Sequence, residues 1–260
     1  MSKIIAYLSS LLFSGALCLP ASAQSAKPLA GVLHYRQITG LTDTNRRTTA
    51  YCLLRFNQHE SVSRFTGKFQ GGNALDSIRR TTIPALMNSN RYASVYTNLK
   101  TSRMVSRQQA FTELVLVDDS LQPIQWTIHS DRRLFNTLNT QKATARVRGR
   151  DYTAWFCPDI PVSTGPWKLF GLPGLILEAY DDKGHVRFLF ESLTIPDLTK
   201  QPIIPPILVN KRNYKSMNEK EFVTKRRDNL VNSGRMANAE PSWENSKTTF
   251  KSTSIELYPD

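Results

Sequence analysis

The chain lacks the patterns that mark common catalytic and metal sites. Its histidines, His34, His59, His129 and His185, include no pair spaced as in the H-E-x-x-H zinc motif. No serine lies in a G-x-S-x-G elbow. These absences predict no metal, no cofactor and a protein that is not an enzyme. The alternative is a hydrolase or metal-dependent enzyme whose site is assembled from scattered His, Cys and Asp residues, since such residues meet only in the folded chain.

Long apolar runs are missing everywhere except at the N-terminus. There a short positive start, Met1-Ser2-Lys3, precedes the apolar run IIAYLSSLLFSGALCL and an A-x-A site at residues 21–23. This three-part pattern is typical of a cleaved secretory signal. We therefore expect a signal peptide over residues 1–23 and a single domain over residues 24–260. No later segment is long and apolar enough to cross a bilayer, so the expected location is the periplasm or the extracellular space.

Cysteine is scarce, with three residues in 260. Cys18 lies in the expected signal peptide and follows the bulky Leu17, which disfavours a lipidated cysteine. Cys52 and Cys157 remain in a compartment where disulfides persist. If they pair, the long closed loop would stabilise the fold by about 4–5 kcal/mol in the chain-entropy model. Cysteine counting favours this candidate disulfide and two independent buried thiols equally.

Acidic residues are too few to balance the basic ones. The chain has 34 Lys and Arg against 21 Asp and Glu, which gives a formal net charge of +13. The basic residues are scattered rather than clustered, so they predict a solvated basic surface. Export excludes nucleic acid as a natural partner and leaves anionic lipids, polysaccharides or acidic proteins.

Short segments with alternating apolar residues dominate the rest of the chain. Residues 143–157 read as a hairpin with Gly149 in its turn, and residues 175–195 as a second hairpin with its tip at 181–184. A helix is expected near residues 218–232, with Gly234 after its end. The pattern predicts a mainly β protein: a large curved antiparallel sheet or an open barrel-like meander, with a C-terminal helix and minor helical pieces. Residues 248–260 are expected to add an edge strand.

The most distinctive stretch is GPWKLFGLPGLILEAYD, from Gly165 to Asp181. No lysine or hydroxyl residue follows Gly174 as it would in a phosphate loop. Pro173 and Gly174 instead suit the central positions of a type II turn, in which the third residue needs a positive φ. Gly171 would then allow close packing of the backbone. On this basis Gly174→Val is expected to destabilise the protein, because a β-branched residue does not tolerate a positive φ.

This stretch resembles the motif that names the GLPGLI family of bacterial envelope proteins. The resemblance extends upstream through KATARVRGRDYTAWFCPDIPVSTGP and is strongest over residues 141–181. It implies an exported protein, often associated with outer-membrane transport systems, and it implies no settled activity and no catalytic residue. The motif positions, which turn chemistry explains as structural, are Gly165, Pro166, Gly171, Leu172, Pro173, Gly174, Leu175 and Ile176.

Tryptophans give the best candidates for ligand contact. Trp126, Trp155 and Trp167 lie in or beside successive expected strands and could line one concave face. A plain hydrophobic core is the alternative, because large aromatic side chains dominate core burial. The sequence therefore predicts a non-enzymatic protein that binds an apolar ligand, an extended peptide or an envelope partner, through its curved face or through a sheet edge.

Overall fold

The computed structural model describes residues 29–41, 47–66, 93–110, 113–199, 201–207 and 216–239. The expected signal peptide, the minor helical pieces and the final edge strand lie outside these ranges. The described elements are β1 (Gly31–Thr39), β2 (Thr48–Phe56), β3 (Glu60–Phe65), β4 (Ser94–Asn98), β5 (Arg103–Ala110), β6 (Glu113–Ser120), β7 (Thr127–Phe135), β8 (Leu138–Val147), β9 (Arg150–Cys157), β10 (Leu175–Asp181), β11 (Val186–Thr194), β12 (Ser216–Asn218) and α2 (Glu219–Ala239).

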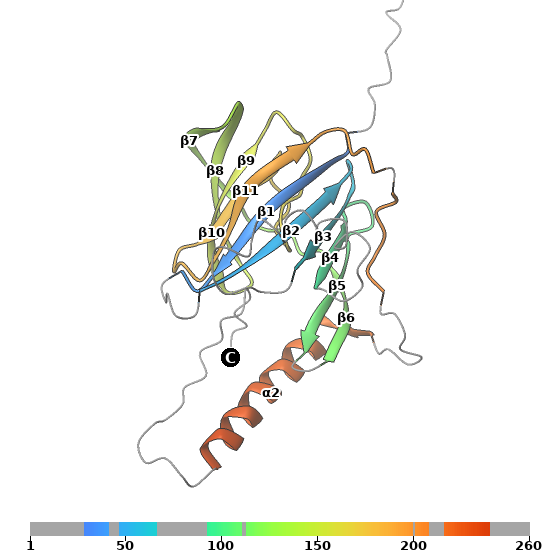
Figure 1. Cartoon of the computed structure of the whole chain (residues 1–260), viewed down its shortest axis with the longest axis vertical. Coiled ribbons are helices and arrows are strands. Elements are labelled where there is room, and N and C mark those ends of the chain that lie inside the picture. The colour runs from blue at the N-terminus through green and yellow to red at the C-terminus, as the bar shows by residue number, and fades with distance from the viewer. Residues whose placement is uncertain are drawn as a thin grey trace, which may run out of the picture.

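All described strands form one open sheet of 12 strands, in the order β12-β6-β5-β4-β3-β2-β1-β11-β10-β9-β8-β7 (Figure 1). Every neighbouring pair is antiparallel except β12 and β6, which are parallel. The predicted mainly β fold with a C-terminal helix is therefore confirmed. Its two ends are β12, which leads into α2, and β7.

Both predicted hairpins are present. Arg148 and Gly149 join β8 to β9 with φ values of 47° and 79°, and positive φ at both central residues is typical of a type I′ turn. Strands β10 and β11 form the second hairpin, with Gly184 at φ 66° near its tip. Asp181 at the start of this tip is buried, with 2% exposure.

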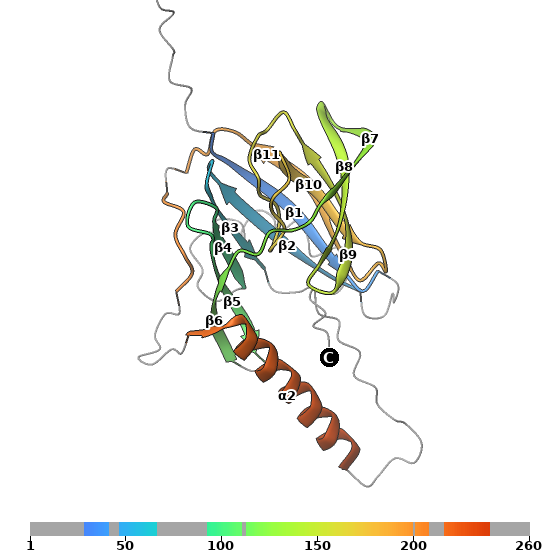
Figure 2. The ribbon, with the colours of Figure 1, turned by 180° about the vertical axis from the view of Figure 1, so that it is seen from behind.

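The loop between β9 and β10, residues 158–174, fills the concave face of the sheet. Figure 2 shows this loop in front of β1 and β2. Tyr35 on β1 donates its hydroxyl hydrogen bond to the carbonyl of Ile176, and Thr164 pairs with Ser61 on β3 at 2.8 Å. Leu169 and Leu172 from the loop are buried in the main core cluster. The concave face is therefore a filled interior.

The described parts of the proline-rich connector, residues 195–199 and 201–207, cross the opposite face of the sheet and are called the strap. Asp197 accepts hydrogen bonds from the Arg55 Nε and Nη2 atoms at 2.9 and 2.6 Å, and the Gln201 carbonyl accepts another from Nη2 at 2.6 Å. The Ile207 carbonyl accepts a bond from Arg107 at 2.8 Å. Both arginines are nearly fully buried, so the predicted solvated basic surface is wrong for these positions. Burial lowers the pKa of Arg107 to about 10.

Acid is expected to loosen the strap. Burial alone would raise the pKa of the Asp197 carboxyl, but hydrogen bonds from Thr199 and Arg55 outweigh burial and hold that pKa below its usual value. Because the folded pKa is depressed, the stabilisation is complete above the unfolded value of about 4 and is lost as the pH falls through the folded value. Urea unfolding should show wild type approaching Asp197→Asn below about pH 4. Curves that stay parallel would contradict this expectation.

Helix α2 is attached to the sheet by its first turns and then projects away from it (Figure 1). Phe222 is fully buried beside Met217 and the β5–β6 residues Ala110, Val115 and Val117. The predicted helix over residues 218–232 is confirmed, but it continues through Gly234 to Ala239. Within the described ranges, no helix has both the length and the apolar character needed to span a membrane.

Candidate functional site

The β9–β10 loop, residues 158–174, contains the first part of the Gly165–Asp181 stretch and is called the motif loop. It places Lys168 inside the protein. The loop is held by backbone hydrogen bonds from Leu175 to Ile160 and from Ile176 to Thr164, both of 3.0 Å. Trp167 has a φ of 59°, which is unusual for a bulky residue. The next residue, Lys168, has no exposed side-chain surface. The loop therefore carries a charged side chain between the buried Trp167 and Leu169.

Two glycines shape the end of this loop, and their roles are the reverse of those predicted. Gly171 has a φ of 94°, and a Cβ added there would approach only the Trp126 ring, at 3.8 Å. Gly174 has no left-handed φ, but an added Cβ would lie 2.3 Å from the Cys157 carbonyl oxygen. The type II turn with positive φ at Gly174 is therefore wrong. Gly174 is required by close backbone approach, and Gly171 by backbone conformation.

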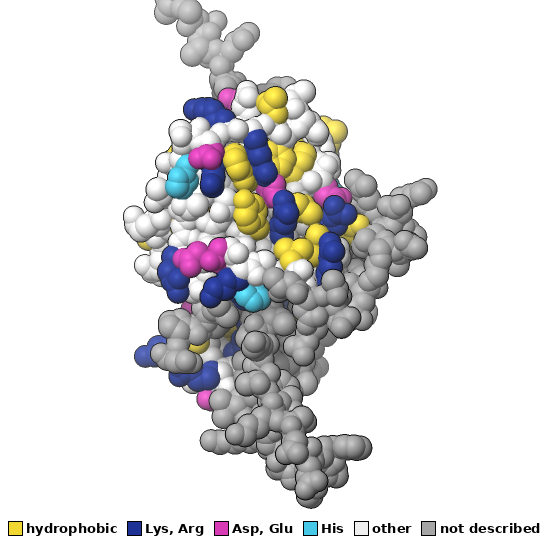
Figure 3. All heavy atoms as spheres, turned by 90° about the vertical axis from the view of Figure 1, so that its left-hand side faces the viewer, with side chains coloured by type: hydrophobic (Ala, Val, Ile, Leu, Met, Phe, Trp, Pro, Cys, Tyr) yellow, Lys and Arg dark blue, Asp and Glu magenta, His cyan; other side chains and the backbone are white. Residues whose placement is uncertain are grey.

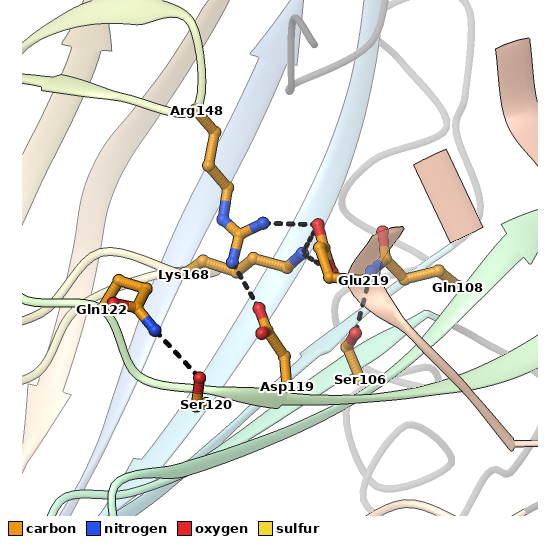
Figure 4. Close-up of polar contacts among 8 residues, drawn as sticks. All are labelled: Ser106, Gln108, Asp119, Ser120, Gln122, Arg148, Lys168 and Glu219. Carbon is orange, nitrogen blue, oxygen red and sulfur yellow. Dashed lines mark hydrogen bonds and ion pairs between the residues drawn. The ribbon is translucent and has the colours of Figure 1, made fainter. Parts of the chain in front are cut away.

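Around Lys168, charged residues from four separate segments converge (Figure 4). The Lys168 Nζ atom lies 3.3 and 3.4 Å from the two carboxylate oxygens of Glu219, the first residue of α2. Arg148, from the β8–β9 turn, contacts Glu219 and donates to Asp119 on β6 at 2.9 Å. Asp119 lies near the end of β6, next to Asp118 of the same strand.

These residues border a partly open cavity of about 400 Å³, which we call the Lys168 cavity. Its walls mix cationic, acidic, amide and apolar side chains, the combination that binding sites for small ligands use to fix orientation. It is lined by Met104, Asp119, Gln122, Pro123, Ile124, Gln125, Arg146, Val147, Arg148, Lys168, Phe170 and Glu219.

The three candidate tryptophans do not line one face. Trp126 precedes β7, and its Nε1 donates to the Phe170 carbonyl at 2.8 Å. Trp167 is buried, with its ring 6.4 Å from that of Tyr152. Trp155 alternates with the buried Ala154 on β9, which places it on the other side of the sheet. Trp126 and Trp167 support the interior, and only Trp155 lies on the outer face.

On the outer face, a buried carboxylate is clamped by arginines. Glu178 is 2% exposed, contacts Arg133, and accepts a 2.6 Å hydrogen bond from Arg187. The guanidinium carbon of Arg133 lies 4.2 Å from the Phe135 ring centroid and 4.1 Å from that of Trp155. This cluster ties β7 to β9, β10 and β11, and its cation–π contacts stabilise the surface beside β7.

The candidate disulfide is not formed: Cys52 and Cys157 are both buried free thiols. Burial raises the pKa of each, and the nearby Asp159 carboxylate also raises that of Cys157. A raised pKa keeps a cysteine in the thiol form, which is a poor nucleophile. Both cysteines therefore behave as core side chains.

Histidine and carboxylate groups form no metal centre within the described parts of the chain, since no group of three or more His, Cys, Asp or Glu residues there could hold an ion. His185 instead packs against the buried Asp181, with Nδ1 3.1 Å from Oδ2. Asp181 also binds Arg150 at 3.0 Å and the backbone N–H groups of His185 and Val186. This cluster closes the β10–β11 hairpin.

Lys168, Arg148 and Glu219 are site residues that no sequence motif marks. For Lys168 a signal was present, because it interrupts an otherwise apolar run inside the motif. Arg148 and Glu219 are 71 residues apart in sequence, so no local pattern could join them.

No curated protein matches the chain. Two structures of PNGF-II, in the C2 and P21 space groups, are similar to 78% of this chain, with a TM-score of 0.49 and 14% sequence identity. The chain spans only about a third of those proteins, 33% and 34%. Residues 94–178, which run from β4 into β10, match the model of a family described as a protein of unknown function, Porph_ging.

Proposed function

We propose that the protein is a non-enzymatic binding protein of the cell envelope that holds an extended segment of a partner along the edge strand β7. Its resemblance to GLPGLI-family proteins supports export to the periplasm or the exterior and a partner in outer-membrane transport. The motif sequence from Gly165 to Ile176 carries that resemblance.

The single observation behind the proposal is the position of β7. It ends the sheet and pairs only with β8 among the described strands. An edge strand presents a row of backbone N–H and C=O groups to which another extended segment can bind. Two apolar side chains on β7 are also exposed, Ile128 by 46% and Leu134 by 65%. They offer side-chain contacts beside the backbone ladder.

The charges of β7 favour a selected partner over a second copy of this chain. Asp131 and Arg132 are exposed between the two apolar residues, and the pairing with β8 shifts register between Ile128 and Arg132. Charges and bulges on an edge strand oppose indiscriminate pairing. The side of the molecule that carries β7 also shows apolar side chains interleaved with Lys and Arg (Figure 3). A partner segment with apolar and acidic residues would complement this surface.

A peptide fits better than an apolar small molecule. The concave face, where an apolar ligand was expected, is occupied by the motif loop and by Trp167. Burial raises the pKa values of Cys52 and Cys157, so neither thiol is an activated nucleophile. The open edge therefore remains the best-supported place for a partner.

Leu134→Lys is expected to weaken peptide binding by about tenfold, because it removes an exposed apolar contact, and the added charge, which stays hydrated and screened, returns less than that contact contributed. Peptides selected on the purified protein from a displayed library of unstructured sequences would serve as probes, with affinity measured by titration. Hydrogen exchange should show slower exchange of the β7 amides in the complex.

Leu198→Lys is the matched control, because Leu198 is 74% exposed and lies on the strap rather than on β7. It should leave binding unchanged. The proposal fails if no peptide is enriched, or if the selected peptides bind equally well to Leu134→Lys and leave β7 exchange unaltered.

A further inference from the structure

We infer that the Lys168 cavity is a carboxylate-binding site, that its ligand is the free C-terminal carboxylate of a peptide segment, and that Glu219 fills the carboxylate position from within the chain. This inference rests on the proposed function, since it assigns one end of the segment that β7 would hold.

The chemistry of the site favours a carboxylate. Lys168 and Arg148 come from different segments, yet both contact the Glu219 carboxylate. A fully buried ammonium group is costly unless an anion compensates it. Two cations converging on one carboxylate make a charge-assisted site that is stronger than neutral hydrogen bonds. Figure 4 shows both side chains pointing toward Glu219.

Glu219 is a replaceable occupant of this position. It is the first residue of α2, and its side chain keeps 18% exposure. The anchor of the helix is Phe222, one turn further on, which packs with Met217 against β5 and β6. Rotation of the Glu219 side chain away from Lys168 would leave this anchor in place. A ligand carboxylate can therefore enter without loss of the helix contact.

The direction of β7 beside the cavity determines which end of a bound segment reaches the cavity, and that end is the C-terminus. Ile124 and Gln125 line the cavity, and the chain enters β7 two residues later, at Thr127. A segment antiparallel to β7 would run toward Thr127 and end beside Gln125. Strands β7 to β11 all pair antiparallel. Ile124 and Phe170 then offer apolar walls for the last side chain of the segment.

The test uses an N-acetylated apolar tripeptide with a free carboxylate and the same tripeptide as its C-terminal amide. Both are titrated calorimetrically into wild type, Glu219→Gln and Glu221→Gln. Glu221→Gln is the matched control, because it removes a carboxylate from the same helical turn but outside the cavity. We expect Glu219→Gln to bind the acid at least about tenfold more tightly than wild type does, and at least about tenfold more tightly than it binds the amide. Glu221→Gln should match wild type.

Introducing Lys168→Met into Glu219→Gln should abolish the preference for the acid. If that double variant does not fold, the comparison of acid and amide on Glu219→Gln decides alone. If Glu219→Gln binds the free-acid and the amidated tripeptide equally tightly, or binds neither of them, the inference is overturned. If Glu219→Gln binds an amidated tripeptide with a central aspartate as tightly as it binds the free-acid tripeptide, the assignment to a chain terminus is overturned. None of these results depends on Leu134→Lys, so strand addition at β7 stands or falls separately.

Discussion

Gly174→Val is expected to lower the free energy of unfolding by about 3 kcal/mol, in the upper range for overpacking of a tight site. A Cβ at Gly174 would lie 2.3 Å from the carbonyl oxygen and 2.7 Å from the carbonyl carbon of Cys157. These are backbone atoms of a central strand pair, because Leu175 of β10 pairs with Cys157 of β9. Neither can move without disturbing the ladder. Urea unfolding with the linear extrapolation method would measure the loss.

Gly171→Ala is the informative comparison for that experiment. A Cβ at Gly171 would make only ordinary contacts of 3.8 and 3.9 Å with Trp126, but the residue has a φ of 94°. The expected loss is therefore the conformational cost alone, about 1–2 kcal/mol. If Gly171→Ala costs as much as Gly174→Val, close approach at Gly174 is not the reason for its glycine.

Asp181→Asn is expected to cost about 3 kcal/mol or more, because it leaves the buried guanidinium of Arg150 without its anion. The Arg150 and Asp181 side chains are 1% and 0% exposed and lie 3.0 Å apart. Asparagine keeps an oxygen that can accept from the backbone N–H groups of His185 and Val186. The loss therefore reports mainly the charge, and thermal and urea unfolding would both register it.

Arg150→Met added to Asp181→Asn should recover much of that loss, since the unpaired charge is then gone, and the double-mutant cycle isolates the pair. Asp151→Asn gives the matched control. Asp151 pairs with Arg146 at 3.0 Å on the β8–β9 hairpin, but their side chains are 53% and 68% exposed, so the expected change is below about 1 kcal/mol. An equally large loss in Asp151→Asn would mean that burial does not control the strength of these pairs.

Much of the fold was predictable because local signals carry it. The β8–β9 turn could be placed at Gly149, since a two-residue hairpin needs positive φ there. The C-terminal helix could be placed from its acidic start and from Phe222. Its end could not, because Gly234 is tolerated inside a helix at a cost of about 1 kcal/mol. The function of Gly174 was also misjudged, because a clash with Cys157 depends on which strand lies beside it.

Most of the candidate site could not be predicted from local sequence patterns. Strand β9 directs Trp155 outward while the loop buries Trp167. Lys168 is meaningful only because Glu219 reaches it from α2, 51 residues away. Side-chain alternation determines which residues share a face of one strand. It contains no information on which distant segment covers that face.

By itself, the amino-acid sequence determined the secondary structure class and the positions of the hairpins, since both depend on neighbours a few residues apart. Only the tertiary structure decided that the concave face is filled, that Cys52 and Cys157 stay apart as thiols, and that β7 is an edge among the described strands. The physical reason is that burial and ion pairing depend on contacts between segments far apart in the chain, and those contacts exist only once the sheet and the β9–β10 loop have packed together.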